Sequence, residues 1–298
     1  MNFEVVFLGT SAAVPSATRA HAAIAIKYFN EIILFDCGEG TQRQLISSKT
    51  SYMKINHIFI THYHGDHFLG LPGLLQTMSL SDRTEPITIY GPRGIREVLD
   101  AVIRICRTEL SFEIIPREIK AGPVYMSDKF RIDAVKVDHS ALTYGLVFEE
   151  VKKREFLREK AISLGVKPGP DFSRLHRGKE VVVDGKTIQP DDVLGGVKKC
   201  KKVVYTSDTR PCQNIVDVSK DAVLIHDSTY DASMQDQAVE ATHSTSVEAA
   251  EVAVQGGAKK LFLTHISPRY SSTVEMLKEA KTVFAATSVA QDFQVYKP

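Results

Sequence analysis

A strand-like segment, Ile55–Ile60, leads directly into the sequence His62-Tyr63-His64-Gly65-Asp66-His67. Four of these six side chains can bind a metal ion. Imidazole suits zinc, and a carboxylate can complete or bridge a site. So tight a loop cannot close one tetrahedron with all four groups, but it can present two of them to each of two ions about 3.5–4 Å apart. The segment therefore predicts a two-metal site at the end of a buried strand.

A second set of metal-capable residues stands directly after other predicted strands: His139, Asp208 and His265. Rigid strand ends position ligands well, and this set would complete two sites. The segments Ile58–His62 and Leu261–His265 also resemble each other, since each is an apolar strand that ends in Thr-His. This similarity hints at a duplicated core that carries its chemistry at the strand ends.

Predicted strands and helices alternate along the chain. Short apolar runs indicate strands at Val5–Leu8, Ala22–Ile26, Ile32–Phe35, Ile87–Tyr90, Phe130–Val137, Val203–Tyr205, Val223–Ile225 and Leu261–Thr264. Helical spacing of apolar residues indicates helices over Leu69–Leu80 and Ile95–Cys106. Capping boxes predict two further helix starts, at Thr245 with Glu248 and at Ser272 with Glu275, the first helix stopping at Gly256-Gly257. The alternation predicts an α/β or layered α+β domain.

The composition excludes several classes of protein. Of the 298 residues, 43% are hydrophobic and 24% are charged, which excludes generic disorder. The net charge of +1 argues against a histone-like nucleic-acid binder. The four widely spaced cysteines predict reduced thiols and no disulfide framework or zinc ribbon: Cys37, Cys106, Cys200 and Cys212. Without a signal peptide or a stretch that could span a membrane, we expect a cytoplasmic protein.

Residues 151–179 differ from the rest of the chain in charge. They hold nine basic and three acidic residues, and their apolar periodicity is weak. They also contain Gly165 and the sequence Lys167-Pro168-Gly169-Pro170. Such a run is by default a solvated charged hairpin. Because the chain also contains the metal motif, we interpret the run as a basic arm inserted in a single domain of residues 1–298. We expect this arm to protrude from the domain and to bind RNA phosphates.

Through H-x-H-x-D-H at His62–His67, the chain resembles the metallo-β-lactamase superfamily, and within it the tRNase Z (ribonuclease Z) family. Matching segments span nearly the whole chain in the expected order: Gly9–Ala13, Gly38–Gln44, Gly70–Leu74, Val137–Ser140, Ser207–Pro211, His243–Thr245 and Leu263–Tyr270. The resemblance implies an αββα sandwich with a protruding basic arm. It also implies a zinc-dependent endoribonuclease that cleaves the 3′ trailer from precursor tRNA and leaves a tRNA 3′-hydroxyl.

The same resemblance implies roles for individual residues. His62, His64 and His139 would bind one zinc ion, Asp66, His67 and His265 the other, and Asp208 would bridge them. A metal-bridging hydroxide would attack the phosphodiester. Asp66 would orient or deprotonate that water, and His243 would stabilise the scissile phosphate or protonate the leaving oxygen. The arm would grip the tRNA elbow, and two chains would form a homodimer; the arm residues are Lys152, Lys153, Arg154, Arg158, Lys160, Lys167, Gly169 and Pro170.

Two other function classes stay open at this point. A zinc hydrolase of the same fold would act on a small phosphodiester, thioester or lactone, although such a substrate has no use for a basic arm. A non-catalytic RNA- or metal-binding protein would often have lost a ligand, and this chain has the full set. The chain also departs from the family pattern, with Arg19-Ala20 for Arg-Asn and His226-Asp227-Ser228-Thr229 for His-Glu-Ala-Thr. The shorter aspartate leaves open whether Asp227 is a partner of His243.

Overall fold

The computed structural model describes residues 3–106, 109–152, 154–196 and 199–298, which divide into two compact units. The first unit comprises Met1–Met126, Arg131–Glu149 and Lys201–Pro298. The second comprises Ser127–Phe130 and Glu150–Cys200. All seven expected metal ligands belong to the first unit, so its fold determines the site.

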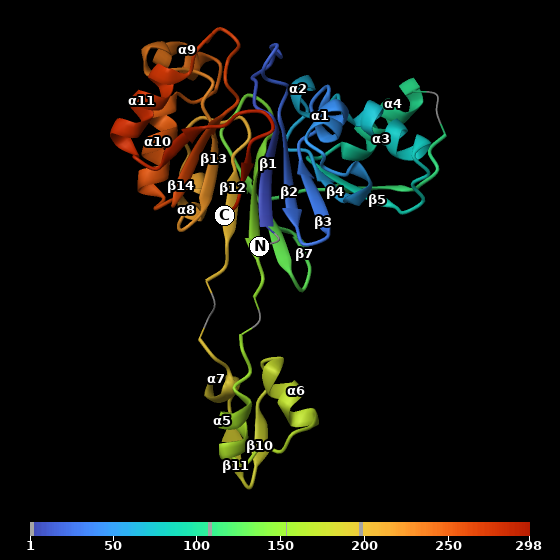
Figure 1. Ribbon diagram of the computed structural model, residues 1–298, viewed down its shortest axis with the longest axis vertical. Helices are drawn as coiled ribbons and strands as arrows, with labels where there is room; N and C mark the ends of the chain where they lie inside the picture. The colour runs from blue at the N-terminus through green and yellow to red at the C-terminus, as the bar shows by residue number, and fades with distance from the viewer. Residues whose placement is uncertain (1–2, 107–108, 153, 197–198) are drawn as a thin grey trace. The chain divides into compact units, whose positions relative to one another are not determined.

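In the described residues, two mixed sheets of seven strands form the centre of the first unit (Figure 1). One sheet has the order β16 (Val295–Tyr296), β1 (Phe3–Gly9), β2 (Ala23–Tyr28), β3 (Glu31–Phe35), β4 (Ile55–Phe59), β5 (Ile87–Gly91) and β6 (Ile114–Glu118). The other has the order β15 (Thr287–Val289), β14 (Lys260–Thr264), β13 (Val223–Asp227), β12 (Lys202–Tyr205), β9 (Tyr144–Glu150), β8 (Phe130–Lys136) and β7 (Gly122–Met126).

Each sheet contains a block of parallel strands. In the first sheet β3 to β6 pair in parallel, and in the second β12 to β15 do. The inner strands of these blocks are buried along most of their length and are mostly apolar, as parallel strands covered on both faces are: β3, β5, β12, β13 and β14. Their carboxyl ends meet at one edge of each sheet, which is the usual place for a functional site in such folds.

Aromatic side chains join the two sheets face to face. The ring of Phe3 lies 5.0 Å from that of Phe148, and the ring of Phe7 lies 5.0 Å from that of Phe262. All four residues are fully buried. Because the rings come from β1 on one sheet and from β9 and β14 on the other, they form the core between the sheets.

Helices cover the outer face of each sheet (Figure 1). The first sheet packs against leucines and isoleucines of α1 (Thr41–Ser47), α3 (Leu71–Leu80) and α4 (Ile95–Cys106). The second packs against apolar residues of α8 (Gln213–Val218), α10 (Ser246–Gln255) and α11 (Val274–Val283). The expected αββα sandwich is confirmed. No helix of the described residues is long and apolar enough to cross a membrane.

Local predictions of helix ends had mixed outcomes. The capping box of α10 is present, with Thr245 and Glu248 exchanging hydrogen bonds, and Gly256 caps its C-terminus. The second capping box was wrong, because Thr273, and not Ser272, precedes α11, and no side chain caps it. The Ser272 hydroxyl accepts only from the N–H of Val274, at 3.3 Å. The single helix expected over Leu69–Leu80 begins at Leu71.

Three short helical segments complete the first unit: η1 (Tyr52–Lys54), α2 (Gly65–Phe68), and η2 (Ala232–Met234) continuing into α9 (Gln235–Glu240). The turn around α2 requires two segments of the main chain, at Gly38 and at Asp66, to lie very close together. A Cβ at Gly38 would lie 2.2 Å from the carbonyl oxygen of Asp66, so only glycine fits there. Gly38 thus lets the metal-binding motif stand directly against the end of β3.

The second unit has a small apolar core of its own. It contains α5 (Arg158–Ser163), α6 (Pro170–His176), the hairpin β10 (Val181–Val183) and β11 (Lys186–Ile188), and α7 (Pro190–Val193). Ala161, Val166, Leu175, Val181 and Val193 are buried together. The unit extends to Cys200, beyond the residues 151–179 that charge, weak apolar periodicity and the Gly-Pro sequence had marked, because the hairpin and α7 complete its core.

Candidate metal centre

The first of three overlapping ligand groups consists of His62, His64, His139 and Asp208, each offering one atom within 4.8 Å of the others. Nε2 of His139 lies 3.3 Å from Nδ1 of His64. Nε2 of His62 lies 3.6 Å from Oδ2 of Asp208. These residues follow β4, β8 and β12, so three strand ends from both sheets supply one group.

The second group consists of Asp66, His67, Asp208 and His265. Oδ1 of Asp208 lies 3.2 Å from Nε2 of His67 and 3.3 Å from Nε2 of His265. Oδ2 of Asp66 lies 3.3 Å from the same His265 atom. Asp208 belongs to both groups, so its two oxygens face two neighbouring positions. The structure brings together all seven residues that the sequence indicated as ligands.

Hydrogen bonds hold Nδ1 of three histidines in these groups, His62, His67 and His139. Nδ1 of His67 contacts Oδ2 of Asp36 at 2.7 Å, and Nδ1 of His62 contacts the Thr61 hydroxyl at 3.1 Å, which in turn donates to Asp36. Nδ1 of His139 contacts the carbonyl oxygen of Thr242 at 2.9 Å. Such contacts fix the tautomer and leave Nε2 of each ring facing the centre.

A matching arrangement holds the second sheet's histidines. Nδ1 of His265 contacts the Thr229 hydroxyl at 2.9 Å, and that hydroxyl donates to Oδ1 of Asp227 at 2.7 Å. Nδ1 of His243 contacts Oδ2 of the same carboxylate at 2.7 Å. Asp36 after β3 and Asp227 at the end of β13 thus each serve two histidines, one directly and one through a threonine. Of the two Thr-His pairs in the sequence, only Thr61-His62 supplies its own linking threonine, because Thr229 and not Thr264 connects His265 to Asp227.

The residues present fit a bound cation. Nε2 of His62, Nε2 of His67 and Oδ1 of Asp208 are buried without a hydrogen-bond partner among the described residues. Buried polar atoms are costly when unpaired, and clustered imidazole and carboxylate atoms are the usual ligands of divalent transition metals. The unpaired atoms converge on the two positions that Asp208 shares, which is where ions would satisfy them.

Asp36 is a functional residue that the sequence reasoning missed. Asp36 is fully buried. Besides its contact with His67, it accepts hydrogen bonds from the main-chain N–H of Thr61 at 2.8 Å and from the hydroxyl of Tyr205 at 2.9 Å. The available signal was its place directly after the strand that ends at Phe35. The same criterion had identified His139 and Asp208.

Replacing Asp36 with asparagine is expected to weaken metal binding by about 10- to 100-fold, because His67 would lose the carboxylate that fixes its ring. Competition with a chelating dye would measure this affinity. Asp221→Asn, at an exposed position paired with Lys259, serves as the matched control. An affinity equal to that of the wild type would mean that Asp36 does not orient His67.

Asp227 does reach His243, which answers the question that the shorter side chain had left open. Asp227 is fully buried, and its carboxylate also accepts from the N–H of Thr209 at 3.0 Å. Burial lowers the pKa of His243, but the adjacent Asp227 carboxylate outweighs it and raises the pKa to about 9. Cations bound nearby would oppose this shift. The pair therefore favours a protonated imidazole at the mouth of the centre.

The chain is similar over nearly its full length to known proteins. The chain is 49% identical over 290 residues to ribonuclease Z of Methanothermobacter thermautotrophicus, covering 97% of this chain and 94% of the relative. It is 44% identical to ribonuclease Z of Archaeoglobus fulgidus, covering 98% and 97%. The crystal structure of human tRNase Z, short form, superposes with a TM-score of 0.72 at 30% identity, covering 99% of this chain and 98% of the other.

The chain belongs to the ribonuclease Z family. Residues 3–163 also match the family model described as anti-Pycsar protein Apyc1, so the chain falls within that sequence group too. The metallo-β-lactamase fold protein YhfI of Bacillus subtilis has a TM-score of 0.72 at 21% identity, which shows the shared fold.

Several residues at the centre of this ribonuclease Z family member adopt a left-handed backbone conformation. Asp36, Ser207, Thr242 and His265 have φ values of 58°, 57°, 57° and 58°. Each such non-glycine residue costs on the order of 1–3 kcal/mol and persists only where surrounding contacts determine it. Of these four, His265 belongs to a ligand group, whereas the side chains of Asp36, Ser207 and Thr242 contact Nδ1 of His67, His62 and His139.

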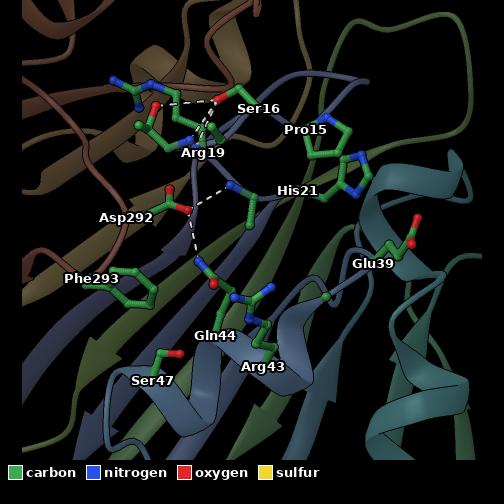
Figure 2. A pocket seen from close by; sticks show the side chains of 14 residues that line it. Pro15, Ser16, Arg19, His21, Glu39, Arg43, Gln44, Ser47, Asp292 and Phe293 are labelled. Carbon is green, nitrogen blue, oxygen red and sulfur yellow. Dashed lines mark hydrogen bonds between the residues drawn. The ribbon is translucent and has the colours of Figure 1, made fainter.

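A cavity of about 470 Å³ lies between the loop Pro15–Ala20 and α1. Asp292 joins loop and helix, accepting hydrogen bonds from both (Figure 2). The guanidinium of Arg19 donates to the Thr10 hydroxyl at 2.6 Å and to a main-chain carbonyl at 2.7 Å, so it braces the loop. The N–H of Ala13 donates to Oδ2 of Asp66 at 2.9 Å, which connects the base of this loop to the metal centre.

The basic residues expected to bind RNA fall into two groups in the second unit. Lys152 pairs with Glu150 at 2.6 Å, and Arg154 donates to the carbonyl oxygens of Gly195 and Leu194, so both are engaged inside the unit. Lys153 lies outside the described residues. Three exposed side chains have no hydrogen bond or ion pair to other described residues: Arg158, Lys160 and Lys167.

Gly169 and Pro170 form the start of α6. Gly169 has φ 153° and ψ −149°, a conformation that is essentially restricted to glycine. Pro170 occupies the first turn of the helix, where a missing N–H costs nothing. Both residues are exposed, and the Gly-Pro pair therefore fixes a sharp entry into a short helix at the surface of the unit.

Proposed function

We propose that this chain cleaves the 3′ trailer from precursor tRNA at the centre built around Asp208, with two zinc ions as cofactors. The observation that carries the proposal is the pair of ligand groups that share one carboxylate, in a member of the ribonuclease Z family. The chain is an endoribonuclease that processes the 3′ end of tRNA, as the family membership implies.

His62, His64 and His139 would hold one ion, Asp66, His67 and His265 the other, with Asp208 between them. Two divalent cations at such a site lower the pKa of bound water and neutralise charge on phosphoryl oxygens. The fixed Nδ1 contacts orient the histidine ligands for this task before any substrate arrives. Preorganised groups of this kind need no rearrangement during the reaction.

We expect two metal ions per chain after the protein is purified without chelator and supplied with zinc. The physical reason is the number of ligands, since seven side chains with a shared carboxylate exceed what one tetrahedral ion takes. Elemental analysis against protein concentration measures the stoichiometry. A value of one or less would contradict the proposed dinuclear site.

Asp66 and His243 would carry the proton transfers. Oδ2 of Asp66 accepts from the Ala13 N–H and faces the second ligand group, so it is placed to take a proton from water there. The ring of His243 lies 5.1 Å from the rings of both His139 and His265, one from each group. With Nδ1 held by Asp227, Nε2 is the atom that would protonate the leaving oxygen.

The second unit would bind the body of the tRNA. Its exposed cations would neutralise backbone phosphates, a contact that needs no base readout. They include Arg158, Lys160, Lys167, Arg174, Arg177 and Lys179. Lys152 and Arg154 would support the fold of the unit, given their internal contacts. A homodimer and a cytoplasmic location stay predictions, and sedimentation at several protein concentrations would test the first.

The direct test is incubation of the zinc-loaded protein with a precursor tRNA that is labelled throughout its length, so that both cleavage products are visible. We expect two products: a shortened tRNA that carries a 3′-hydroxyl, and the intact released trailer. A chelator should stop the reaction, and zinc should restore it. Turnover of bis(p-nitrophenyl) phosphate without cleavage of the precursor would instead favour the small-substrate hydrolase.

A further inference from the structure

Arg210 has a place in the fold that the roles above do not explain. It stands two residues after the shared carboxylate of Asp208, and its side chain is 16% exposed. Its main-chain N–H donates to the carbonyl oxygen of Asp138 at 2.8 Å, next to the ligand His139. The backbone of Arg210 thereby joins the loop after β12 to the loop after β8.

The guanidinium of Arg210 reaches a third loop. Nη1 donates to the carbonyl oxygen of His243 at 2.5 Å and to Oε2 of Glu248 at 2.8 Å, while Nη2 pairs with the other oxygen of Glu248. Glu248 in turn accepts from the N–H of Thr245 at 2.9 Å. The fork of one arginine thus clamps the main chain on both sides of Ser244.

Several contacts make this clamp rigid. Glu248 is 13% exposed and also accepts from the side chain of Gln235 at 2.7 Å. The hydroxyl of Ser244 donates to the carbonyl oxygen of Thr209 at 2.6 Å. Two-point pairing of a guanidinium with a carboxylate fixes orientation as well as distance, which a lysine cannot do. The loop His243–Thr245 is therefore held against the Asp208 segment from both ends.

We propose that Arg210, through its pair with Glu248, is a positioning residue that fixes the distance and orientation of the His243 imidazole relative to the metal centre. Arg210 is outside both ligand groups and need not touch substrate. The inference rests on the proposed role of His243 as the proton donor to the leaving oxygen. Truncating Arg210 would free the His243 carbonyl and leave a mostly buried carboxylate unpaired, so the loop would shift.

The test compares two substrates that differ in their need for a proton. The leaving ribose oxygen of precursor tRNA needs protonation, whereas the nitrophenolate of bis(p-nitrophenyl) phosphate does not. Arg210→Met is expected to lower kcat for precursor tRNA by about 100-fold, the effect of a misplacement near 1 Å, with KM changed less than about threefold. Turnover of the nitrophenyl substrate and the bound zinc should change little. Arg210→Lys should restore part of kcat.

The double variant shows whether Arg210 acts through His243. On precursor tRNA, Arg210→Met combined with His243→Ala should be no slower than His243→Ala alone. Arg131→Met is the matched control, since Arg131 also pairs with a glutamate, Glu149, at 2.7 Å, at the far end of β8 from His139. It should leave both activities unchanged.

Three outcomes would overturn the inference. Additive losses in the double variant would mean that Arg210 acts independently of His243. Equal losses on both substrates, or loss of zinc, would mean a merely structural role. If Arg210→Met does not fold, the same substrate comparison is made with Arg210→Lys, which keeps the charge but not the fork. Wild-type cleavage of precursor tRNA by His243→Ala would instead remove the proposed role of His243, and this inference with it.

Discussion

Asp66→Ala is expected to abolish cleavage of precursor tRNA while RNA binding survives. Asp66 supplies a ligand atom to the second group and the only carboxylate oxygen of that group besides those of Asp208. Removing it takes away both a metal ligand and a proton acceptor, so the rate should fall on the order of 1,000-fold or more. Affinity for the RNA depends mainly on phosphate contacts elsewhere and should stay within about threefold.

Single-turnover cleavage and fluorescence anisotropy with labelled RNA measure the two quantities separately. Asp66→Asn is the informative partner variant, since its amide oxygen can still accept from the Ala13 N–H but cannot take a proton. Asp221→Asn removes an exposed negative charge as the control, since asparagine tolerates the left-handed backbone at this position. If Asp66→Ala kept activity within about tenfold of the wild type, a barrier change of only about 1.4 kcal/mol, the catalytic assignment of Asp66 would be wrong.

Removing the second unit is expected to separate RNA binding from chemistry. Glu149 of β9 is the antiparallel partner of Lys202 of β12, so a two-residue Asn-Gly turn can replace residues 150–201 and close a hairpin. The apparent KM for precursor tRNA should rise on the order of 100-fold, because the exposed cations of the unit are lost. Hydrolysis of bis(p-nitrophenyl) phosphate should be retained, since every ligand of the metal centre lies in the first unit.

The salt dependence distinguishes a phosphate-binding unit from an inert one. Each lost phosphate contact should reduce the slope of log affinity against log salt by about 0.7–0.9. A triple variant that replaces Arg158, Lys160 and Lys167 with alanine should show part of both effects without removing the unit. Replacing Lys259, Lys278 and Lys281 of the first unit is the matched control. Equal loss of both activities on excision would mean that the unit supports the fold of the centre.

The residues that cluster at the candidate metal centre were predictable because their signals are local. A strand of apolar residues must end where the chain leaves the sheet, and His62, His139, Asp208 and His265 each follow such an end. The spacing of the metal-capable residues in His62–His67 indicates metal binding independently of the rest of the sequence. The capping box at Thr245 was also predictable, since both partners lie within one turn of helix. In each case the side chain lies close in sequence to its interaction partner or to the strand that positions it.

What lies around those ligands was decided only by tertiary structure. Asp36 meets His67 across 31 positions of the chain, and Arg210 meets Glu248 across 38, through pairings that sheet register and helix packing bring about. The second unit extends to Cys200 because distant apolar residues share its core, although the local sequence signals marked only residues 151–179. Sequence by itself determined which side chains can bind metal and roughly where the chain presents them. The fold decided how each of these side chains is oriented. A hydrogen bond or a packed contact between distant segments forms only after the sheets have brought those segments together.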